Sequence, residues 1–277
     1  MRCNGDDDHR AQCARAFFSR RPRFYIHCAM TTIPLAPRPV ALRPLSLPTE
    51  HGAWGFLLEP IALGMFVAPS RSGALIAAAA VLAFFAHQPL RLALQDAVRR
   101  RVYPRTPYCW LIAAAYLIAA SPVLAIYPPV LLIIAASFAF VQLFFDAHNC
   151  SRELVAELSG AVAMSSLAAA IAIRGGLSTA TALGLAGIVA ARALPSIVYV
   201  RALLRGGRKR PVIIAHALAV VVVALYASPF AIVAMIVLLL RAIWGVTHEP
   251  PRARLVGWRE IAFGATTVIL AAIGFVR

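Results

Sequence analysis

Long apolar runs follow one another from Ala53 to the end of the chain, and short polar or Pro- and Gly-containing stretches separate them. Each run approaches the roughly 20 helical residues that cross a hydrocarbon core. Lipid offers no water to an open backbone, so helices are the expected form. The pattern predicts an all-α, polytopic transmembrane helical bundle. Its nine expected spans are 53–69, 73–94, 109–126, 129–146, 154–173, 177–200, 212–227, 229–247 and 259–276.

Basic residues are concentrated in every second connection between these spans. The connections after the second, fourth, sixth and eighth spans hold Arg99, Arg100, Arg101, Arg105, Arg152, Arg201, Arg205, Arg208, Lys209, Arg210, Arg252 and Arg254. The other connections hold Arg71 and Arg174. Cytoplasmic loops of membrane proteins carry the excess of Lys and Arg. We therefore expect the even connections and the N-terminus to be cytoplasmic.

Residues 1–48 differ from the rest because they contain no continuous apolar run and are basic and rich in Pro. They predict a disordered tail in front of a single transmembrane domain, residues 49–277. Met30 offers a plausible start codon, so we expect residues 1–29 to be an annotation artefact.

Overall composition agrees with a membrane protein. Hydrophobic residues make up 61% of the chain and charged residues 14%, against about 25% charged in soluble domains. The net charge of +16 lies between apolar runs and not along one soluble face. Anionic lipid headgroups of the bilayer, and no nucleic acid, are thus the expected partners of the basic residues.

Costly polar residues gather at the first span. Glu50 and His51 stand at its cytoplasmic entrance, and Glu59 precedes Pro60 inside it. A carboxylate within a membrane costs roughly 2.5–3.5 kcal/mol, which favours a functional role. Glu50, His51 and Glu59 are therefore candidate catalytic residues. The alternatives are a headgroup-level His51 and a Glu59 close to the opposite interface.

Two further carboxylates begin the fifth span. Glu153 and Glu157 are four residues apart and so share one helical face, where they could hold Mg²⁺. Glu157 is also a catalytic candidate. The alternative is a structural cluster in which Arg152, Arg192 or Arg201 neutralises them.

Apart from Glu59, these residues lie toward one leaflet, so we expect a cytoplasm-facing polar pocket made from the first, second, fourth, fifth and sixth spans. The basic turns Arg99–Arg105 and Arg205–Arg210 could clamp a diphosphate, because Arg offers paired donors to phosphate oxygens. The alternative is that they are topology signals in contact with lipid headgroups.

The run from Glu50 to Pro60, the Gln88–Leu90 segment and the Tyr103–Thr106 turn resemble the YwiC-like family of bacterial integral membrane proteins. The resemblance extends from about Pro48 to Phe275. It implies a multi-pass protein of the bacterial inner membrane and a set of suspect residues, but no particular reaction.

The nine spans are also distantly similar to UbiA-type prenyltransferases, which implies transfer of an isoprenoid or other lipid diphosphate with Mg²⁺. In place of that family's Asn-Asp-x-x-Asp motif, this chain has His87, Gln88 and Pro89, followed by Asp96. Since the family's acidic motif is absent, the carboxylates that would supply the metal ligands in its place are Asp96, Asp146, Glu153 and Glu157. The residues that it implies on phosphate are Arg105, Arg152, Arg192 and Arg201.

Two other functions are compatible with the same residues. In a proton- or ion-coupled transporter of a small solute, Glu59, Glu157 and Arg192 would form the coupling site. In a non-catalytic membrane subunit, the basic face would dock an acidic partner or anionic lipid.

Overall fold

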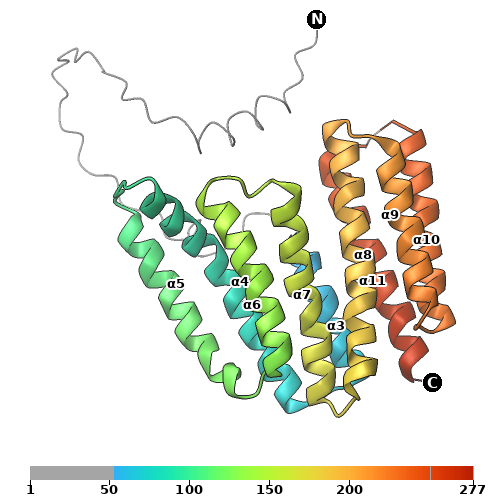
Figure 1. The fold of residues 1–277 in the computed structure, drawn as a ribbon, viewed down its shortest axis with the longest axis horizontal. Coiled ribbons are helices and arrows are strands. Elements are labelled where there is room, and N and C mark those ends of the chain that lie inside the picture. The colour runs from blue at the N-terminus through green and yellow to red at the C-terminus, as the bar shows by residue number, and fades with distance from the viewer. Residues whose placement is uncertain (1–52, 250, 277) are drawn as a thin grey trace, which may run out of the picture. The chain divides into compact units, whose positions relative to one another are not determined.

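The computed structural model describes residues 53–249 and 251–276, which belong to the compact unit Ala41–Arg277. The predicted tail, the Met30 start, Glu50 and His51 lie outside the described residues. Within those residues the chain is all helical, with nine α-helices, one short 3₁₀ helix and no strand (Figure 1).

The helices coincide with the nine expected spans. They are α3 (Ala53–Val67), α4 (Arg71–Val98), α5 (Thr106–Ala120), α6 (Pro129–Ala147), α7 (Leu154–Arg174), α8 (Thr179–Arg205), α9 (Lys209–Ala224), α10 (Pro229–Thr247) and α11 (Ala253–Val276), with the 3₁₀ helix η1 (Ser121–Ala125) after α5. Seven of them, all except α3 and α9 and counting α5 together with η1, are long and apolar enough to cross a membrane. The fold-class prediction is thereby confirmed for the described residues.

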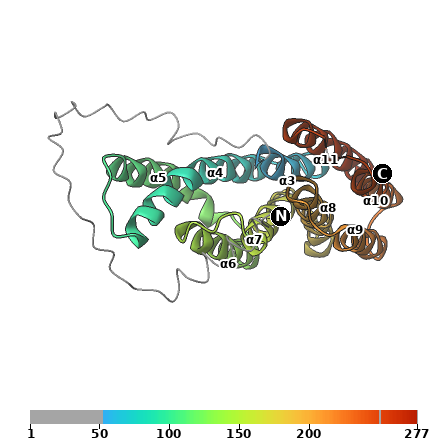
Figure 2. The ribbon, with the colours of Figure 1, turned by 90° about the horizontal axis from the view of Figure 1, so that it is seen from above.

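The helices of this unit form two rows (Figure 2). One row contains α5, α4, α3 and α11, and the other contains α6, α7, α8 and α9. Helix α10 packs against α8, α9 and α11. It thereby closes the gap between the two rows at the end formed by α9 and α11. As a result, α3, α8, α9, α10 and α11 surround one part of the interior.

Helix α7 is the most buried of the long helices, because its sequence is dominated by small residues. The run Ala168–Ala172 is fully buried. Gly64 of α3 lies against it so closely that an added Cβ would stand 2.9 Å from the Ile171 side chain. Small residues let membrane helices approach closely and gain van der Waals contact. The α3–α7 contact therefore depends on the absence of a side chain at Gly64.

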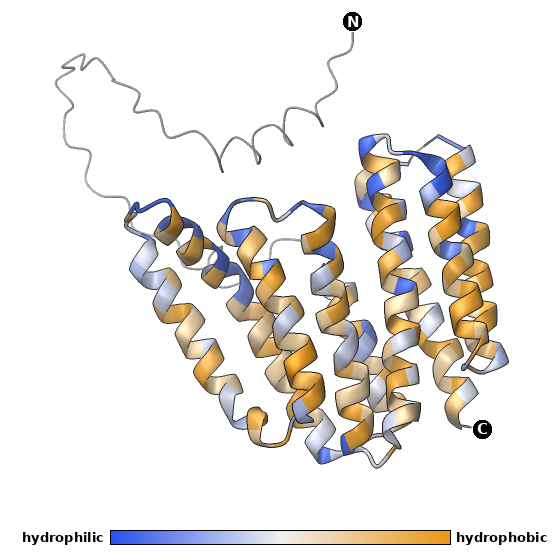
Figure 3. Cartoon of the chain, in the orientation of Figure 1, coloured by the Kyte–Doolittle hydropathy of each residue, from blue (hydrophilic) through white to orange (hydrophobic). Residues whose placement is uncertain are grey.

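The outer surfaces of α5 and α6 expose large apolar side chains. Leu111, Ile118 and Phe140 are 68%, 70% and 70% exposed, and the hydropathy colouring shows apolar residues along most of both helices (Figure 3). A soluble protein rarely exposes contiguous apolar surface on this scale. These surfaces suit contact with lipid.

The connections after α4, α6, α8 and α10 all lie at the same end of this unit (Figure 1). That end is also where hydrophilic residues concentrate in Figure 3. The four connections are those in which the sequence concentrates Arg. We refer to this end as the basic end.

Candidate functional site

Four charged side chains from four helices meet in the interior, and we call them the charge network. They are Glu59 of α3, Arg192 of α8, Arg241 of α10 and Glu260 of α11. Arg192 is 3% exposed, and Glu59 and Arg241 are each 8% exposed. Glu59, Arg241 and Glu260 each lie about two helical turns from the basic end of their helices. The network is therefore inside the bundle and not at its surface.

Arg192 connects three helices. Its Nε lies 3.0 Å from Glu59 Oε2, and its Nη2 lies 3.8 Å from Glu260 Oε2. The same Nη2 donates a hydrogen bond of 2.6 Å to the backbone carbonyl of Glu260. The guanidinium thus joins α8 to both α3 and α11 and has two carboxylates within reach.

Arg241 completes the network on the other side of Glu260. Its Nη1 pairs with Glu260 Oε1, and its Nη2 donates to Ser196 Oγ at 3.3 Å. The guanidinium carbon also lies over the Tyr199 ring, 4.2 Å from the centroid, and 5.2 Å from that of Phe263. Flat contact with aromatic faces stabilises a desolvated guanidinium.

His216 of α9 joins the network as a neutral acceptor. Its Nδ1 lies 2.8 Å from the Val212 carbonyl, which can only accept, so Nδ1 carries the proton. Its Nε2 lies 3.2 Å from Arg241 Nη2, which can only donate. The ring is therefore the Nδ1–H tautomer, and the network balances two guanidinium groups against two carboxylates.

A glycine makes room for the network. Gly264 follows Glu260 by one turn of α11, and a Cβ there would overlap the Glu59 carboxylate and crowd Arg192. Any larger residue would force the α3 carboxylate away from the α8 guanidinium. The close approach of the charged groups is thus built into the backbone packing of α3 against α11.

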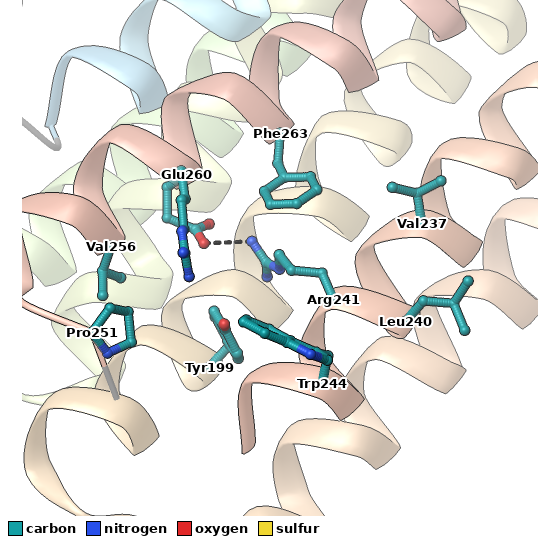
Figure 4. A pocket seen from close by; sticks show the side chains of 10 residues that line it. Tyr199, Val237, Leu240, Arg241, Trp244, Pro251, Val256, Glu260 and Phe263 are labelled. Atoms are coloured by element: carbon teal, nitrogen blue, oxygen red, sulfur yellow. Dashed lines mark hydrogen bonds and ion pairs between the residues drawn. The ribbon is translucent and has the colours of Figure 1, made fainter. Parts of the chain in front are cut away.

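A cavity of about 380 Å³ adjoins the network between α8, α10 and α11 (Figure 4). Arg241 and Glu260 form part of its wall, together with Arg259 and the rings of Tyr199, Trp244 and Phe263. Its volume falls within the range of about 300–1,000 Å³ usual for small-molecule sites. Of the five spans for which the sequence predicts a pocket, α8 alone contributes to this one.

The predicted site residues are distributed over three places. Glu59 and Arg192 meet in the charge network, as the transport hypothesis expects of these two. Glu157 does not join them: its carboxylate lies 3.0 Å from Arg201 and 3.7 Å from Arg205. The Glu157–Arg201 pair is one that the sequence offered as a structural alternative.

The Glu157 cluster fastens α7 to α8. Besides its ion pair, Arg201 Nη1 donates 2.6 Å to the Arg152 carbonyl, and Arg205 Nη1 donates 3.2 Å to the same oxygen. Arg152 therefore contributes its backbone to this contact. Glu153 is the N-cap residue of α7, and its side chain makes no capping hydrogen bond.

Asp96 and Asp146 hold the basic ends of α4, α5 and α6 together. Asp96 accepts hydrogen bonds from Thr106 Oγ1 at 2.7 Å and Arg105 Nη2 at 3.3 Å. Asp146 Oδ2 lies 2.8 Å from His87 Nε2. Each of these carboxylates has its own partner on a neighbouring helix.

The carboxylates predicted as metal ligands do not converge. Across the part of the chain that the structure describes, no group of three or more His, Cys, Asp or Glu side chains is placed to hold a metal ion. Asp96, Asp146 and Glu157 are instead paired separately, as described above. The geometry therefore gives no support to a shared Mg²⁺ site.

Two members of the charge network, Arg241 and Glu260, were not among the residues singled out from the sequence. The signal for Arg241 was present, because it is the one charged residue within the apolar run 229–247. Glu260 gave a weaker signal, because it stands almost at the start of the last expected span.

The comparison with protein families gives one result. The model of the family described as YwiC-like protein matches residues 47–172, which include Glu59 and most of the helices from α3 to α7. No curated protein and no solved structure matches the chain.

Proposed function

Residues 47–172 match the model of the YwiC-like family, and from that premise we propose that this multi-pass membrane protein is a proton- or ion-coupled transporter of a small solute. Its site is the charge network, and its membrane is the bacterial inner membrane. The basic end and the N-terminus face the cytoplasm in this proposal, in accordance with the excess of Arg in the even connections.

The position of four mutually compensated charges inside the bundle, three of them buried, carries the proposal. Charged groups within a membrane are costly and commonly mark ion or proton pathways. A buried ion pair is also a weak source of stability, since apolar replacements of similar volume are often as stable. A network drawn from four helices beside a cavity is therefore better explained by a function than by stability alone.

The geometry supplies a means of coupling. Arg192 lies 3.0 Å from Glu59 and 3.8 Å from Glu260, so two carboxylates share one guanidinium. A proton that binds Glu59 removes its charge and leaves Arg192 paired with Glu260 alone. The link between α3 and α8 then weakens while the link between α8 and α11 persists. Proton binding thereby favours a different packing of α3 against its neighbours.

The transferase alternative receives less support, because three of the four carboxylates expected to bind Mg²⁺, Asp96, Asp146 and Glu157, are separately paired with an arginine or a histidine. It remains testable on its own. Saturable, Mg²⁺-dependent binding of prenyl diphosphates to the purified protein, lost in Glu157→Gln, would favour transfer over transport.

Proteoliposomes containing a pH-sensitive dye test the transport proposal. A panel of small organic acids, amines and neutral solutes is added outside, and internal pH is recorded against protein-free liposomes. We expect at least one class to produce a protein-dependent pH change that Glu59→Gln abolishes. Glu157→Gln is the matched control, because it removes a carboxylate outside the charge network, and it should retain the change.

Two results would contradict the proposal. One is an equal pH change in the wild type and Glu59→Gln. The other is the absence of any protein-dependent change over the whole panel when the protein is shown to be folded and inserted.

A further inference from the structure

The cavity between α8, α10 and α11 has an uneven distribution of charge. Three of its lining residues are ionised: Arg241, Glu260 and Arg259. Arg241 and Glu260 neutralise each other through their ion pair. Arg259 makes a cation–π contact with Trp244 at 5.7 Å, and no ion pair of Arg259 occurs in the described part of the chain. The wall therefore carries one uncompensated positive charge.

A second feature of the wall is an unused donor. Arg241 Nε is buried and has no hydrogen-bond partner, although the rest of its guanidinium is bonded. Buried donors in native proteins are nearly always satisfied, and each exception requires an explanation such as a bound ligand. Arg241 is also one of the residues that line the cavity.

The remaining lining is apolar and reaches the lipid-facing surface. Val237, Leu240 and Phe263 lie in the wall, and Figure 4 shows Phe263 beside Arg241, with Val237 and Leu240 to one side of them. Leu240 is 60% exposed and Trp244 is 52% exposed. On a membrane-spanning helix such exposure means contact with lipid tails. An apolar tail can thus leave the cavity between α10 and α11 without entering water.

We propose that this cavity binds an amphiphilic monoanion, with a carboxylate or phosphodiester headgroup against Arg259 and Arg241 and an apolar tail along Val237 and Leu240. One negative charge balances the surplus positive charge of the wall. The proposal deepens the transport function and rests on it only in treating the bound molecule as the solute that moves. Binding itself is measured separately.

The test uses full-length protein in nanodiscs of zwitterionic phosphatidylcholine, with octanoate as the probe and tryptophan fluorescence as the signal. Trp244→Phe identifies the part of the signal that comes from the cavity. Two comparison probes have a similar apolar tail and a different headgroup: octanol is neutral, and octyltrimethylammonium is positively charged. We expect a saturable response to octanoate, and responses to the two other probes at least about tenfold weaker.

Arg259→Gln removes the surplus charge and should weaken octanoate binding by about tenfold or more. Arg254→Gln is the matched control, because Arg254, like Arg259, is exposed on α11 but does not line the cavity; it should bind octanoate as the wild type does. A thermal melt of each variant confirms that it is folded. Arg259 lies outside the charge network, so its replacement leaves the ion pairs of that network in place.

A second arm distinguishes the two sources of such a headgroup. If the natural occupant is an anionic lipid, phosphatidylglycerol in the nanodisc should compete and raise the apparent Kd of octanoate. If it is a free carboxylate, phosphatidylglycerol should leave that Kd unchanged. Either result agrees with a monoanion site.

Equal binding of octanol and octanoate, equal weakening by Arg259→Gln and Arg254→Gln, or no saturable response would each overturn the inference. Failure of the transport proposal has a different signature. Octanoate binding that persists without solute-coupled pH change contradicts transport alone, whereas pH change without octanoate binding contradicts the monoanion site alone.

Discussion

Arg192 is the residue on which the charge network depends, since it has Glu59 on one side and Glu260 on the other. Removal of one partner from a buried ion pair costs about 3–5 kcal/mol, because the other charge is left uncompensated. We expect Arg192→Gln to lower the free energy of unfolding by about that amount. Denaturant unfolding of the protein in mixed micelles, followed by circular dichroism, measures the change.

The more exposed Glu157–Arg201 pair provides the comparison. Its side chains are 28% and 25% exposed, and pairs in contact with solvent contribute about 0–1 kcal/mol. Arg201→Gln should therefore cost much less than Arg192→Gln. The double variant Glu59→Gln with Arg192→Gln should recover part of the loss. Equal costs for Arg192→Gln and Arg201→Gln would show that burial does not set the energy of the network.

At the residue scale, the sequence predicted half of the network. Glu59 and Arg192 stand out as charges inside apolar runs, and the cost of such charges makes them suspect without any structure. The sequence did not predict that Glu59 and Arg192 form a pair, apart from the transport hypothesis that put both in one site. The two residues lie far apart in the sequence, and their pairing joins α3 to α8. Glu260 looked interfacial because the last span was expected to begin at residue 259. Helix α11 begins at Ala253 instead, which places Glu260 about two turns inside.

The helices themselves were predictable because the bilayer fixes the length of an apolar run. The residues at which the helices begin and end were less predictable. Helices α4 and α11 extend several residues beyond the expected spans, through Arg- and Gln-containing turns. Helical hydrogen bonding continues past the hydrocarbon core where hydropathy has already fallen. The extensions matter, because they place Asp96 on a helix and not in a loop, and they move Arg259 and Glu260 from the start of the last span to the interior of α11.

The contact between α3 and α7 gives a prediction at the same scale. A Cβ at Gly64 would lie 2.9 Å from Ile171 Cβ and 3.1 Å from the Ala168 carbonyl. Gly64→Ala should thus overpack the contact and cost about 1–3 kcal/mol. Gly257→Ala in α11 is the control, because no atom lies within 4 Å of its added Cβ. Alanine is the better helix former, so Gly257→Ala should be neutral or stabilising by up to about 1 kcal/mol.

Both variants are read by thermal unfolding of the detergent-solubilised protein under identical conditions. A melting temperature that falls for Gly64→Ala and holds for Gly257→Ala supports tight packing of α3 on α7. A Gly64→Ala variant as stable as the wild type would mean that α3 and α7 can separate without loss, and the Glu59 carboxylate would then have no fixed distance from Arg192.

For the whole molecule, the arrangement of the connections decides how the charge network is reached. The connections after α4, α6, α8 and α10 lie at one end of the described unit (Figure 1), and three members of the charge network, Glu59, Arg241 and Glu260, lie about two turns below that end. In the proposed orientation, which follows the excess of Arg in these connections, this end faces the cytoplasm. Under the transport proposal, protons and solute would then reach Glu59 and Glu260 over a short path from the cytoplasm and a longer path from the periplasm.

Reporter fusions test this orientation. Fusions at Val102 and Gly207, in the connections after α4 and α8, should be active with a cytoplasmic reporter and inactive with a periplasmic one. Fusions at Tyr127 and Ala227, in the connections after α5 and α9, should show the reverse. If all four results are inverted, the helix count stands but the network opens to the periplasm. If Val102 and Gly207 report from opposite sides, the four helices between them do not all cross, and charges drawn from α3, α8, α10 and α11 cannot lie at one depth in a membrane.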